Sequence, residues 1–462
     1  MTEVAALPDE FLVRLHDDVV VGGLLTRGVR VMKLSATGRA LLGDRELAVT
    51  SPVTAALAAR LLDLDLAVPV LPERGPRWLD DVTVVVPVRD RAAGVDRLLA
   101  ELAPSVRCVV VDDASLDAAS LAAVARRHGA QLVRLDRNRG PAAARNAGLR
   151  EVTTAWVAFV DSDVTLAVAD LRRLLAHFAD PGLAAVAPRV RSRGGRRWFE
   201  RYEDAHGALD LGATSATVRQ WSPVSYVPTA CLVVRVSALG AGFDERLVSG
   251  EDVDLVWTLV DGGSRVRHAA EIDAWHEGRT SVRSWLGRKA FYGSSAAPLA
   301  RRHGARVAPA VFTPSSASVV SLLAVPTRWL APASAVVAAR LLGSVSADLP
   351  DADARTRARV AVSSVAVTGR QTTDLALRHW WPATLVLACA SRRARRLVAG
   401  AALADGVLTW ARADTTLDPV RFTAARRLDD LAYGAGVWWG AARDRSVRCL
   451  LPHWIRPGRA GR

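Results

Sequence analysis

Cysteine is scarce in this 462-residue chain, and its scarcity excludes two kinds of site. The four cysteines, Cys108, Cys231, Cys389 and Cys449, are scattered, and no two of them form a C-x-x-C pair. A structural zinc site and a disulfide framework both need cysteines at characteristic spacings. We therefore expect neither, and we expect the protein to work in a reducing compartment.

Long apolar runs are also missing. The first residues, MTEVAALPDEF, lack the basic start and apolar core of a signal peptide, so we expect a cytoplasmic protein. In the last third, SSASVVSLLAVP and WLAPASAVVAARLL are divided by Pro326 and Arg328, and ATLVLACAS stops at SRRARR. None of these stretches reaches the roughly 20 uninterrupted apolar residues of a membrane span. They predict helices on a bilayer surface or a re-entrant hairpin, and the alternative is a soluble helical domain.

Acidic residues are in deficit only in the last part of the chain. Residues 279–462 hold 28 Lys or Arg against 10 Asp or Glu, a net charge of +18, whereas residues 1–278 carry a net charge of −4. Basic segments attract nucleic acid or the anionic inner leaflet of a membrane. No nucleic-acid module is recognisable here, so the expected partner is the inner face of the cell membrane and not nucleic acid. The alternative is a solvated basic face.

Three domains are predicted, because the chain is too long for one ordinary core. Residues 1–76 alternate short strand-like and helical pieces and end in VPVLPERGP, which is typical of a linker. Residues 80–300 carry strong β and α signals, and residues 301–462 form a helical, basic, Ala- and Arg-rich region.

The middle domain is expected to be an α/β domain with a mainly parallel, Rossmann-like sheet. DVTVVVPV, RCVVVDD, AQLVRL and WVAFVDSD are β-rich runs with few polar interruptions, as in strands covered on both faces. AGVDRLLAELA, SLDAASLAAVARRHG and GPAAARNAGLREV lie between them and have helical patterns. This alternation predicts right-handed crossovers, with ligands bound at the carboxyl ends of the strands.

The predicted strands end in polar residues. Asp161 and Asp163 form a D-x-D pair at the end of one strand. An extended turn places both carboxylates on one side, where they suit Mg²⁺ or Mn²⁺, and the metal's other ligands are phosphate oxygens and water. The alternative is that they cap a helix that starts near Ala167. Asp112 and Asp113 end another strand, where a carboxylate can accept hydrogen bonds from a base or a ribose.

Two arginines and a later acidic helix complete the candidate set. Arg139 and Arg145 follow the third strand and are expected to face a nucleotide or its phosphates, or else solvent. In GEDVDL, Asp252 opens an amphipathic helix, where it either faces a cleft or only suits the helix dipole. His276, in DAWHEGRTS, is expected in a short strand or loop, either as a nitrogen ligand of the same metal or in a structural role.

The order VVVPVRD, VVVDDAS, NRGPAAARNAG, FVDSDV, GEDVDL, WHEG resembles the family-2 glycosyltransferases of the GT-A fold. The resemblance covers roughly residues 80–300. It implies that Pro87, Arg89, Asp112 and Asp113 bind the nucleotide, that Asp161 and Asp163 are the metal motif, that Asp252 is the catalytic base, and that His276 is a further metal ligand. The QxxRW motif of processive polysaccharide synthases is missing, so long-chain synthesis is not expected.

A narrower resemblance is to the mycofactocin-system glycosyltransferases of actinobacteria, in RKAFYGSSAAPLARRHG and in VVGGLLTRGVRVMKLSATGRALLGD. The first 76 residues also look like the small winged-helix peptide-binding modules of peptide-modification pathways. These resemblances imply an inverting hexosyltransferase that moves glucose from UDP-glucose onto a peptide-derived redox cofactor and builds a short β-linked glucan. The alternatives are a membrane glycosyltransferase for lipid or cell-wall acceptors, and a non-catalytic peptide-binding scaffold.

Overall fold

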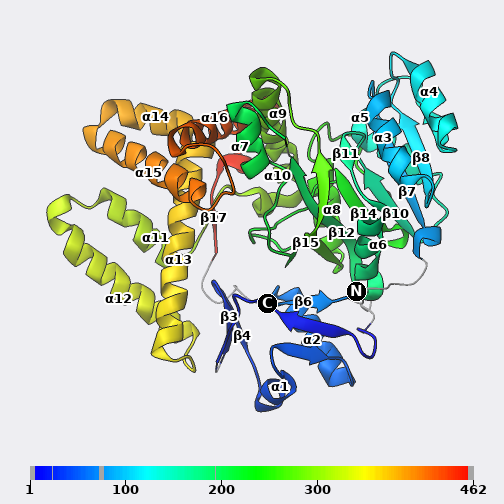
Figure 1. Ribbon diagram of the computed structural model, residues 1–462. Helices are drawn as coiled ribbons and strands as arrows, with labels where there is room; N and C mark the ends of the chain where they lie inside the picture. Colours follow the sequence, from blue (N-terminus) through cyan, green and yellow to red (C-terminus); the bar gives the residue numbers. More distant parts are fainter. Residues whose placement is uncertain (1–5, 23, 72–77, 193, 456–462) are drawn as a thin grey trace. The chain divides into compact units, whose positions relative to one another are not determined.

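Figure 1 shows the computed structural model, which describes residues 6–22, 24–71, 78–192 and 194–455. The chain divides into two compact units, each with hydrophobic clusters of its own. The first unit comprises Met1–Arg14 and Arg45–Trp285, and the second comprises Leu15–Asp44 and Leu286–Arg462.

The first unit is built on a nine-stranded sheet of the order β11-β15-β12-β14-β10-β7-β8-β9, with β13 paired to β15. The strands are β7 (Val82–Val88), β8 (Arg107–Asp112), β9 (Gln131–Arg134), β10 (Trp156–Val160), β11 (Val164–Thr165), β12 (Leu183–Ser192), β13 (Ala216–Thr217), β14 (Cys231–Arg235) and β15 (Arg265–His276). The residues of β7 are almost all buried because helices cover both faces, as its apolar sequence predicts.

Strands β10, β7, β8 and β9 are parallel neighbours, which confirms the predicted βαβ units. Strand β14 is antiparallel to both β10 and β12, so the sheet is mixed although mainly parallel. The α/β alternation in the sequence extends only to β10, so the direction of β14 could not be predicted from it.

The helices of this unit follow the predicted alternation. They are α3 (Ala92–Leu102), α4 (Ala118–Arg127), α5 (Gly140–Leu149), α6 (Val168–Ala176), α7 (Trp198–His206) and α8 (Glu251–Asp261). In α3 the buried residues Val95, Leu98, Leu99 and Leu102 repeat at helical spacing and join the core beneath the sheet. The carboxyl ends of β7, β8 and β10 therefore open at one edge, where the polar residues of the predicted site follow them.

The N-terminal region forms two small sheets. Strands β1 (Leu12–Leu15), β5 (Glu46–Ala48) and β6 (Ala67–Val70) make one, and β2 (Val20–Val21), β3 (Leu24–Arg27) and β4 (Arg30–Lys33) make the other. Its helices are α1 (Ala36–Leu41) and α2 (Pro52–Asp63), and α2 begins at a capping box of Ser51 and Thr54. The predicted linker at 68–76 begins within β6, and residues 72–77 lie outside the described part of the chain.

The C-terminal region is helical, as predicted. Its helices are α9 (Val282–Ser294), α10 (Ala296–His303), α11 (Pro314–Ser321), α12 (Leu330–Asp348), α13 (Ala354–Asp374), α14 (Trp381–Ala390), α15 (Arg392–Trp410) and α16 (Pro419–Arg443). Two short strands, β16 (Val311–Phe312) and β17 (His453–Trp454), pair in parallel. Within the described residues, α12 alone is long and apolar enough to cross a bilayer, and one such helix is weak evidence for a span.

Candidate active site

The D-x-D pair lies in a tight turn between β10 and β11. The backbone N–H of Asp161 donates to the carbonyl of Ala230, and the N–H of Val164 donates back to the carbonyl of Asp161, both at 2.9 Å. Helix α3 packs directly on this turn, because a Cβ at Gly94 would clash with the carbonyl oxygen of Ser162. The capping alternative is wrong: Ala167 is the N-cap of α6, and neither aspartate hydrogen-bonds to that helix.

Asp163 faces His276 across two antiparallel strands. Val164 of β11 is opposite His276 of β15, and the N–H of Glu277 donates to the Asp163 carbonyl at 2.9 Å. The Asp163 Oδ2 atom lies 3.4 Å from His276 Nε2. Burial opposes the charged carboxylate, but the hydrogen bond and charge of His276 lower the pKa of Asp163 to about 2. Asp163 is therefore ionised at neutral pH.

Arg145 joins the D-x-D turn to helix α8. Its side chain, only 4% exposed, donates from one terminal nitrogen to Asp161 Oδ1 and from the other to Glu251 Oε1, each at 2.8 Å. The guanidinium also lies over the Phe243 ring, 5.5 Å from its centroid. Burial raises the pKa of Asp161 in spite of Arg145, and Asp163 and Glu251 raise it further. The Arg145 guanidinium thus holds two carboxylates from segments 90 residues apart in the chain.

Asp252 occupies the second position of α8, next to Glu251. The helix begins after Gly250, which has a φ of +82° that a non-glycine residue would strain to adopt. The Asp252 Oδ1 atom accepts a hydrogen bond from the N–H of Val253 at 2.8 Å. Burial, followed by repulsion from Glu251, raises the pKa of Asp252 to about 7. A carboxylate with a pKa near neutral pH is suited to take a proton from a substrate hydroxyl.

The residues expected at the nucleotide lie at the ends of β7 and β8. Pro87 is half-buried, and Arg89 is exposed beside Asp90, with 3.6 Å between the Arg89 Nε and Asp90 Oδ2 atoms. Asp112 is buried, accepts a 2.8 Å hydrogen bond from the N–H of Ser115 and pairs with Arg134. These polar groups border the edge at which β10 presents the D-x-D turn.

Asp113 and Arg139 fix the start of α5. The Asp113 carboxylate accepts hydrogen bonds from the N–H groups of Arg139 and Gly140, at 2.7 and 2.8 Å. It thereby satisfies two of the unpaired donors at the helix N-terminus. The Arg139 side chain pairs with Glu245 at 2.6 Å, so in this structure it points to the segment before α8.

Helix α5 and the segment from Gly242 to Glu251 are joined by several side chains. Asn146 donates to the Phe243 carbonyl at 2.9 Å and accepts from the Phe243 N–H at the same distance. Asn146 also donates to Glu245 at 3.1 Å, and Arg145 reaches Glu251 as described above. The acidic loop before α8 is therefore positioned by the helix that follows β9.

The structure brings Asp161, Asp163, His276 and, through Arg145 and Glu251, Asp252 to the same end of the sheet. Sequence reasoning missed the role of Glu251, and the pairing of Arg145 with it corrects the alternative in which Arg145 faces solvent. No group of three or more His, Cys, Asp or Glu side chains is preassembled for a metal within the described residues. Any bound divalent cation would therefore take part of its coordination from substrate and water.

Comparison with known proteins agrees with the family resemblance seen in the sequence. The model of the family described as Glycosyl transferase family 2 matches residues 83–243. The pre-mycofactocin glycosyltransferase of Mycobacterium tuberculosis is 41% identical over 469 residues, which cover 96% of this chain and 98% of that protein. An uncharacterized glycosyltransferase of Mycobacterium bovis is 37% identical over 205 residues, 44% of this chain and 89% of that protein.

Among solved structures, a mannosyltransferase from Pyrobaculum calidifontis in complex with GDP-Man and Mn²⁺ is 18% identical, with a TM-score of 0.39. The match covers 66% of this chain and 89% of that one. A likeness at this score says nothing about the site. The match to the M. tuberculosis protein, in contrast, spans nearly the whole of both chains.

Proposed function

The chain belongs to the family-2 glycosyltransferases, in the group of the pre-mycofactocin glycosyltransferases, and we propose that it moves glucose from UDP-glucose onto a hydroxyl of a peptide-derived redox cofactor precursor. Glycosyl transfer follows from the family. The donor sugar, the β-linkage, the short glucan and the acceptor are parts of the proposal.

The observation that carries the proposal is the pair of ion contacts made by Arg145. They connect Asp161 at a strand end to Glu251 at the start of α8, and Asp252 follows Glu251 directly. A transferase needs a group that neutralises the departing diphosphate close to a group that activates the acceptor. This arrangement supplies candidates for both at one end of the sheet.

The donor atoms fit a hard divalent cation that keeps few protein ligands. Asp163 is held ionised, His276 offers a ring nitrogen beside it, and Asp161 ends the neighbouring strand. We assign these three residues as the candidates that would hold Mg²⁺ or Mn²⁺, with diphosphate oxygens and water as the remaining ligands. When bound at these residues, such a cation would supply positive charge against the leaving diphosphate.

The proposed transfer is a single displacement. The acceptor hydroxyl oxygen attacks the anomeric carbon from the face opposite the diphosphate, and its proton passes to the Asp252 carboxylate. As the new carbon–oxygen bond forms, the bond from the anomeric carbon to the diphosphate oxygen breaks and UDP leaves with the electron pair. One displacement inverts the anomeric centre, so an α-linked donor gives a β-glycoside. Asp112, Asp113, Pro87 and Arg89 are the candidates that hold the nucleotide.

The acceptor half of the proposal involves the N-terminal region. Residues 1–76 are proposed to bind the peptide-derived acceptor, as in winged-helix peptide modules. Within the first unit, the end of this region is tied to the catalytic sheet, because Asp65 Oδ1 accepts a 2.8 Å hydrogen bond from the Thr217 N–H and Asp63 pairs with Arg265 at 2.7 Å. These contacts support a fixed position of α2 and β6 on the transferase core.

A panel of nucleotide-sugars tested with purified peptide-derived acceptor checks the proposal directly. We expect a product heavier than the acceptor by one hexose, or a few, with UDP-glucose and a divalent cation. Hydrolysis of the donor without transfer to this acceptor would refute the proposed identity of the acceptor. If no nucleotide-sugar is turned over, the non-catalytic scaffold is favoured. Enzyme with Asp252→Asn is the control for contaminating activity.

A second acceptor class is favoured by one observation, the exposed apolar side chains of the C-terminal helices. A lipid or cell-wall acceptor would share the donor site and differ only in what receives the sugar. Labelled UDP-glucose incubated with enzyme and cell extract separates the two, because the label enters either a lipid fraction or a small water-soluble product. A cytoplasmic location at the inner face of the cell membrane is compatible with both acceptors and is part of the proposal.

A further inference from the structure

The second unit exposes large apolar side chains on several helices. Val386 and Leu387 of α14 are 68% and 61% exposed, and Leu403 of α15 is 58% exposed. Further examples are Val336 and Leu342 on α12, Val362, Val365 and Val367 on α13, and Leu397, Val407 and Leu408 on α15. No residue of α14 is buried, and in α15 only Gly406 is. An apolar surface of this extent usually meets a partner or a membrane.

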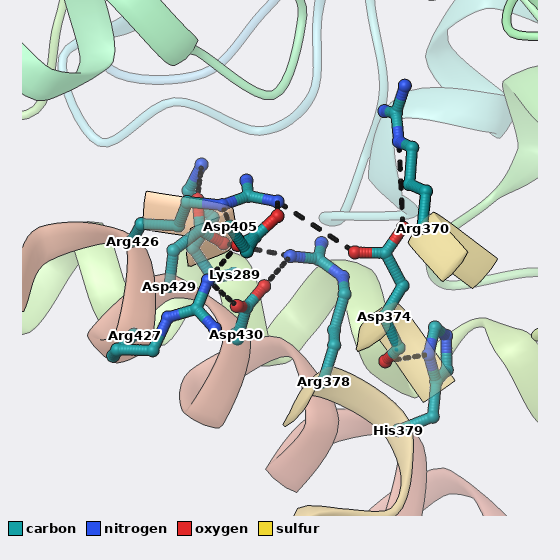
Figure 2. A network of polar contacts seen from close by, with 10 residues as sticks. All are labelled: Lys289, Arg370, Asp374, Arg378, His379, Asp405, Arg426, Arg427, Asp429 and Asp430. Carbon is teal, nitrogen blue, oxygen red and sulfur yellow. Dashed lines mark hydrogen bonds and ion pairs between the residues drawn. The ribbon is translucent and has the colours of Figure 1, made fainter. Parts of the chain in front are cut away.

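Charged side chains lie inside the same unit, where Figure 2 shows them as one network. Asp405 of α15 pairs with Arg426 of α16 at 2.6 Å, and Arg427 contacts both Asp405 and Asp430. Lys289 of α9 pairs with Asp429 at 2.9 Å. Arg378, in the π-helical turn Leu375–His379, pairs with Asp430 at 2.9 Å. Asp429 and Asp430 are 4% and 3% exposed.

The unit therefore has ionic contacts in its interior and apolar side chains on its surface. A helix of a water-soluble protein turns its apolar stripe inward and its charged face to solvent. In α15 this placement is reversed, because Asp405 pairs with Arg426 in the interior while Leu403 is exposed. In a hydrocarbon environment, ionisable side chains face the interior of a helical bundle and pair with one another.

Small residues let the helix backbones approach closely around this network. A Cβ at Gly406 of α15 would clash with the Thr423 side chain of α16, and a Cβ at Gly436 of α16 would clash with the Ala290 carbonyl of α9. Packing through small residues is the usual mode of association where apolar side chains gain nothing by leaving the surrounding solvent, as in lipid. The close packing through small residues and the ionic interior of the unit are thus both features of helices in a lipid environment.

The charge of this part of the chain favours a negatively charged surface. Residues 279–462 carry a net charge of +18, and the exposed residues Arg392, Arg393, Arg395 and Arg396 lie at the junction of α14 and α15. Figure 1 shows α12, α14 and α15 on the same side of α13 within this unit.

Helix α14 is too short to span a bilayer. Its 10 residues are about 15 Å long, half of the roughly 30 Å hydrocarbon core.

We infer that this unit binds the surface of a bilayer of anionic phospholipids. The exposed apolar side chains of α12, α14 and α15 enter the outer part of the acyl layer, and the arginines at the start of α15 lie among the phosphate headgroups. The inference specifies the proposed location at the membrane and does not depend on the sugar or the acceptor, so vesicle binding and glycosyl transfer can fail separately.

The test is flotation of the full-length protein with vesicles of phosphatidylcholine alone or mixed with phosphatidylglycerol. We expect binding to the anionic vesicles that weakens as salt is added. The Val386→Glu/Leu387→Glu variant should lose at least about a hundredfold in vesicle affinity, since burying each side chain is typically worth roughly tenfold or more. The Arg392→Gln/Arg396→Gln variant should lose about fivefold for each charge removed.

The control is Val53→Glu, which introduces one glutamate at a residue that is as exposed as Leu387, at 61%, but lies in the first unit. It should bind vesicles like the wild type. Circular dichroism should be unchanged in all variants, and transfer to a soluble acceptor should be unchanged in the α14 and arginine variants. These two results show that a variant has lost the surface for the membrane and not its fold. The inference is overturned if the wild type ignores anionic vesicles, or if the α14 variant binds them normally. It is also overturned if the wild type is a dimer that this variant separates into monomers, because a second copy then covers the face.

Discussion

The buried arginine of the candidate active site offers the sharpest test of the proposed geometry. Arg145→Met keeps most of the apolar stem but leaves Asp161 and Glu251 without their shared cation. Removing one partner of a buried ion pair typically costs about 3–5 kcal/mol. For a domain of this size that loss corresponds to a fall in Tm of roughly 6–20 °C. Because both carboxylates also border Asp252, turnover should fall together with stability.

Thermal unfolding of four proteins measures the effect: the wild type, Arg145→Met, Glu251→Gln and the double variant. Glu251→Gln removes one of the two buried carboxyl charges, so the double variant should be more stable than the sum of the single losses predicts, by about 0.5–3 kcal/mol. Arg139→Met is the matched control, since its partly exposed pair with Glu245 is expected to contribute only about 0–1 kcal/mol. A fall in Tm for Arg145→Met no larger than for Arg139→Met, or strict additivity in the cycle, would refute the bridging role.

Further outcomes follow from the same site. Asp252→Asn should keep donor binding and lose roughly 10²–10⁴-fold in transfer rate, measured by product formation, and near-normal turnover would exclude it as the base. Asp163→Ala should abolish Mn²⁺-dependent binding of UDP-glucose in calorimetry; retained metal dependence would remove it from the ligand set. Burial raises the pKa of Asp252 to about 7, so kcat/KM for the acceptor should decline as the pH falls through 7, and the limb should vanish in Asp252→Asn. Gly94→Ala should destabilise the protein by about 1–3 kcal/mol and weaken donor binding, because the added methyl group displaces the turn at Ser162; an unchanged Tm and donor affinity would contradict this packing.

Much of the catalytic fold could be predicted from the sequence because its signals are local. The apolar runs 82–88, 107–112 and 156–160 and the helical spacing of Val95, Leu98 and Leu99 each depend on neighbouring residues. The polar residues at strand ends could be predicted as a group, since parallel strands of alternating βαβ units end at one edge.

The remaining features depend on contacts between distant residues. Arg145 and Glu251 are 106 residues apart, and no spacing rule links an arginine in one helix to the first turn of another. The pairing of β11 with β15, which places Asp163 beside His276, involves a strand of only two residues that carries no periodic signal. The interior of the second unit was equally hidden, because Asp405 looks like an isolated acidic residue in its helix until Arg426 and Arg427 are placed beside it.

The links between α5 and the segment from Gly242 to Glu251 have a consequence for protein engineering. Through Asn146, Arg139 and Arg145, residues 139–146 and 242–251 behave as one cassette. A chimera that imports only one of these stretches from a homologue loses these contacts. Its buried polar atoms then face residues that cannot pair with them. Exchanging both stretches together keeps these contacts, so the pair is the natural unit in which to recombine relatives.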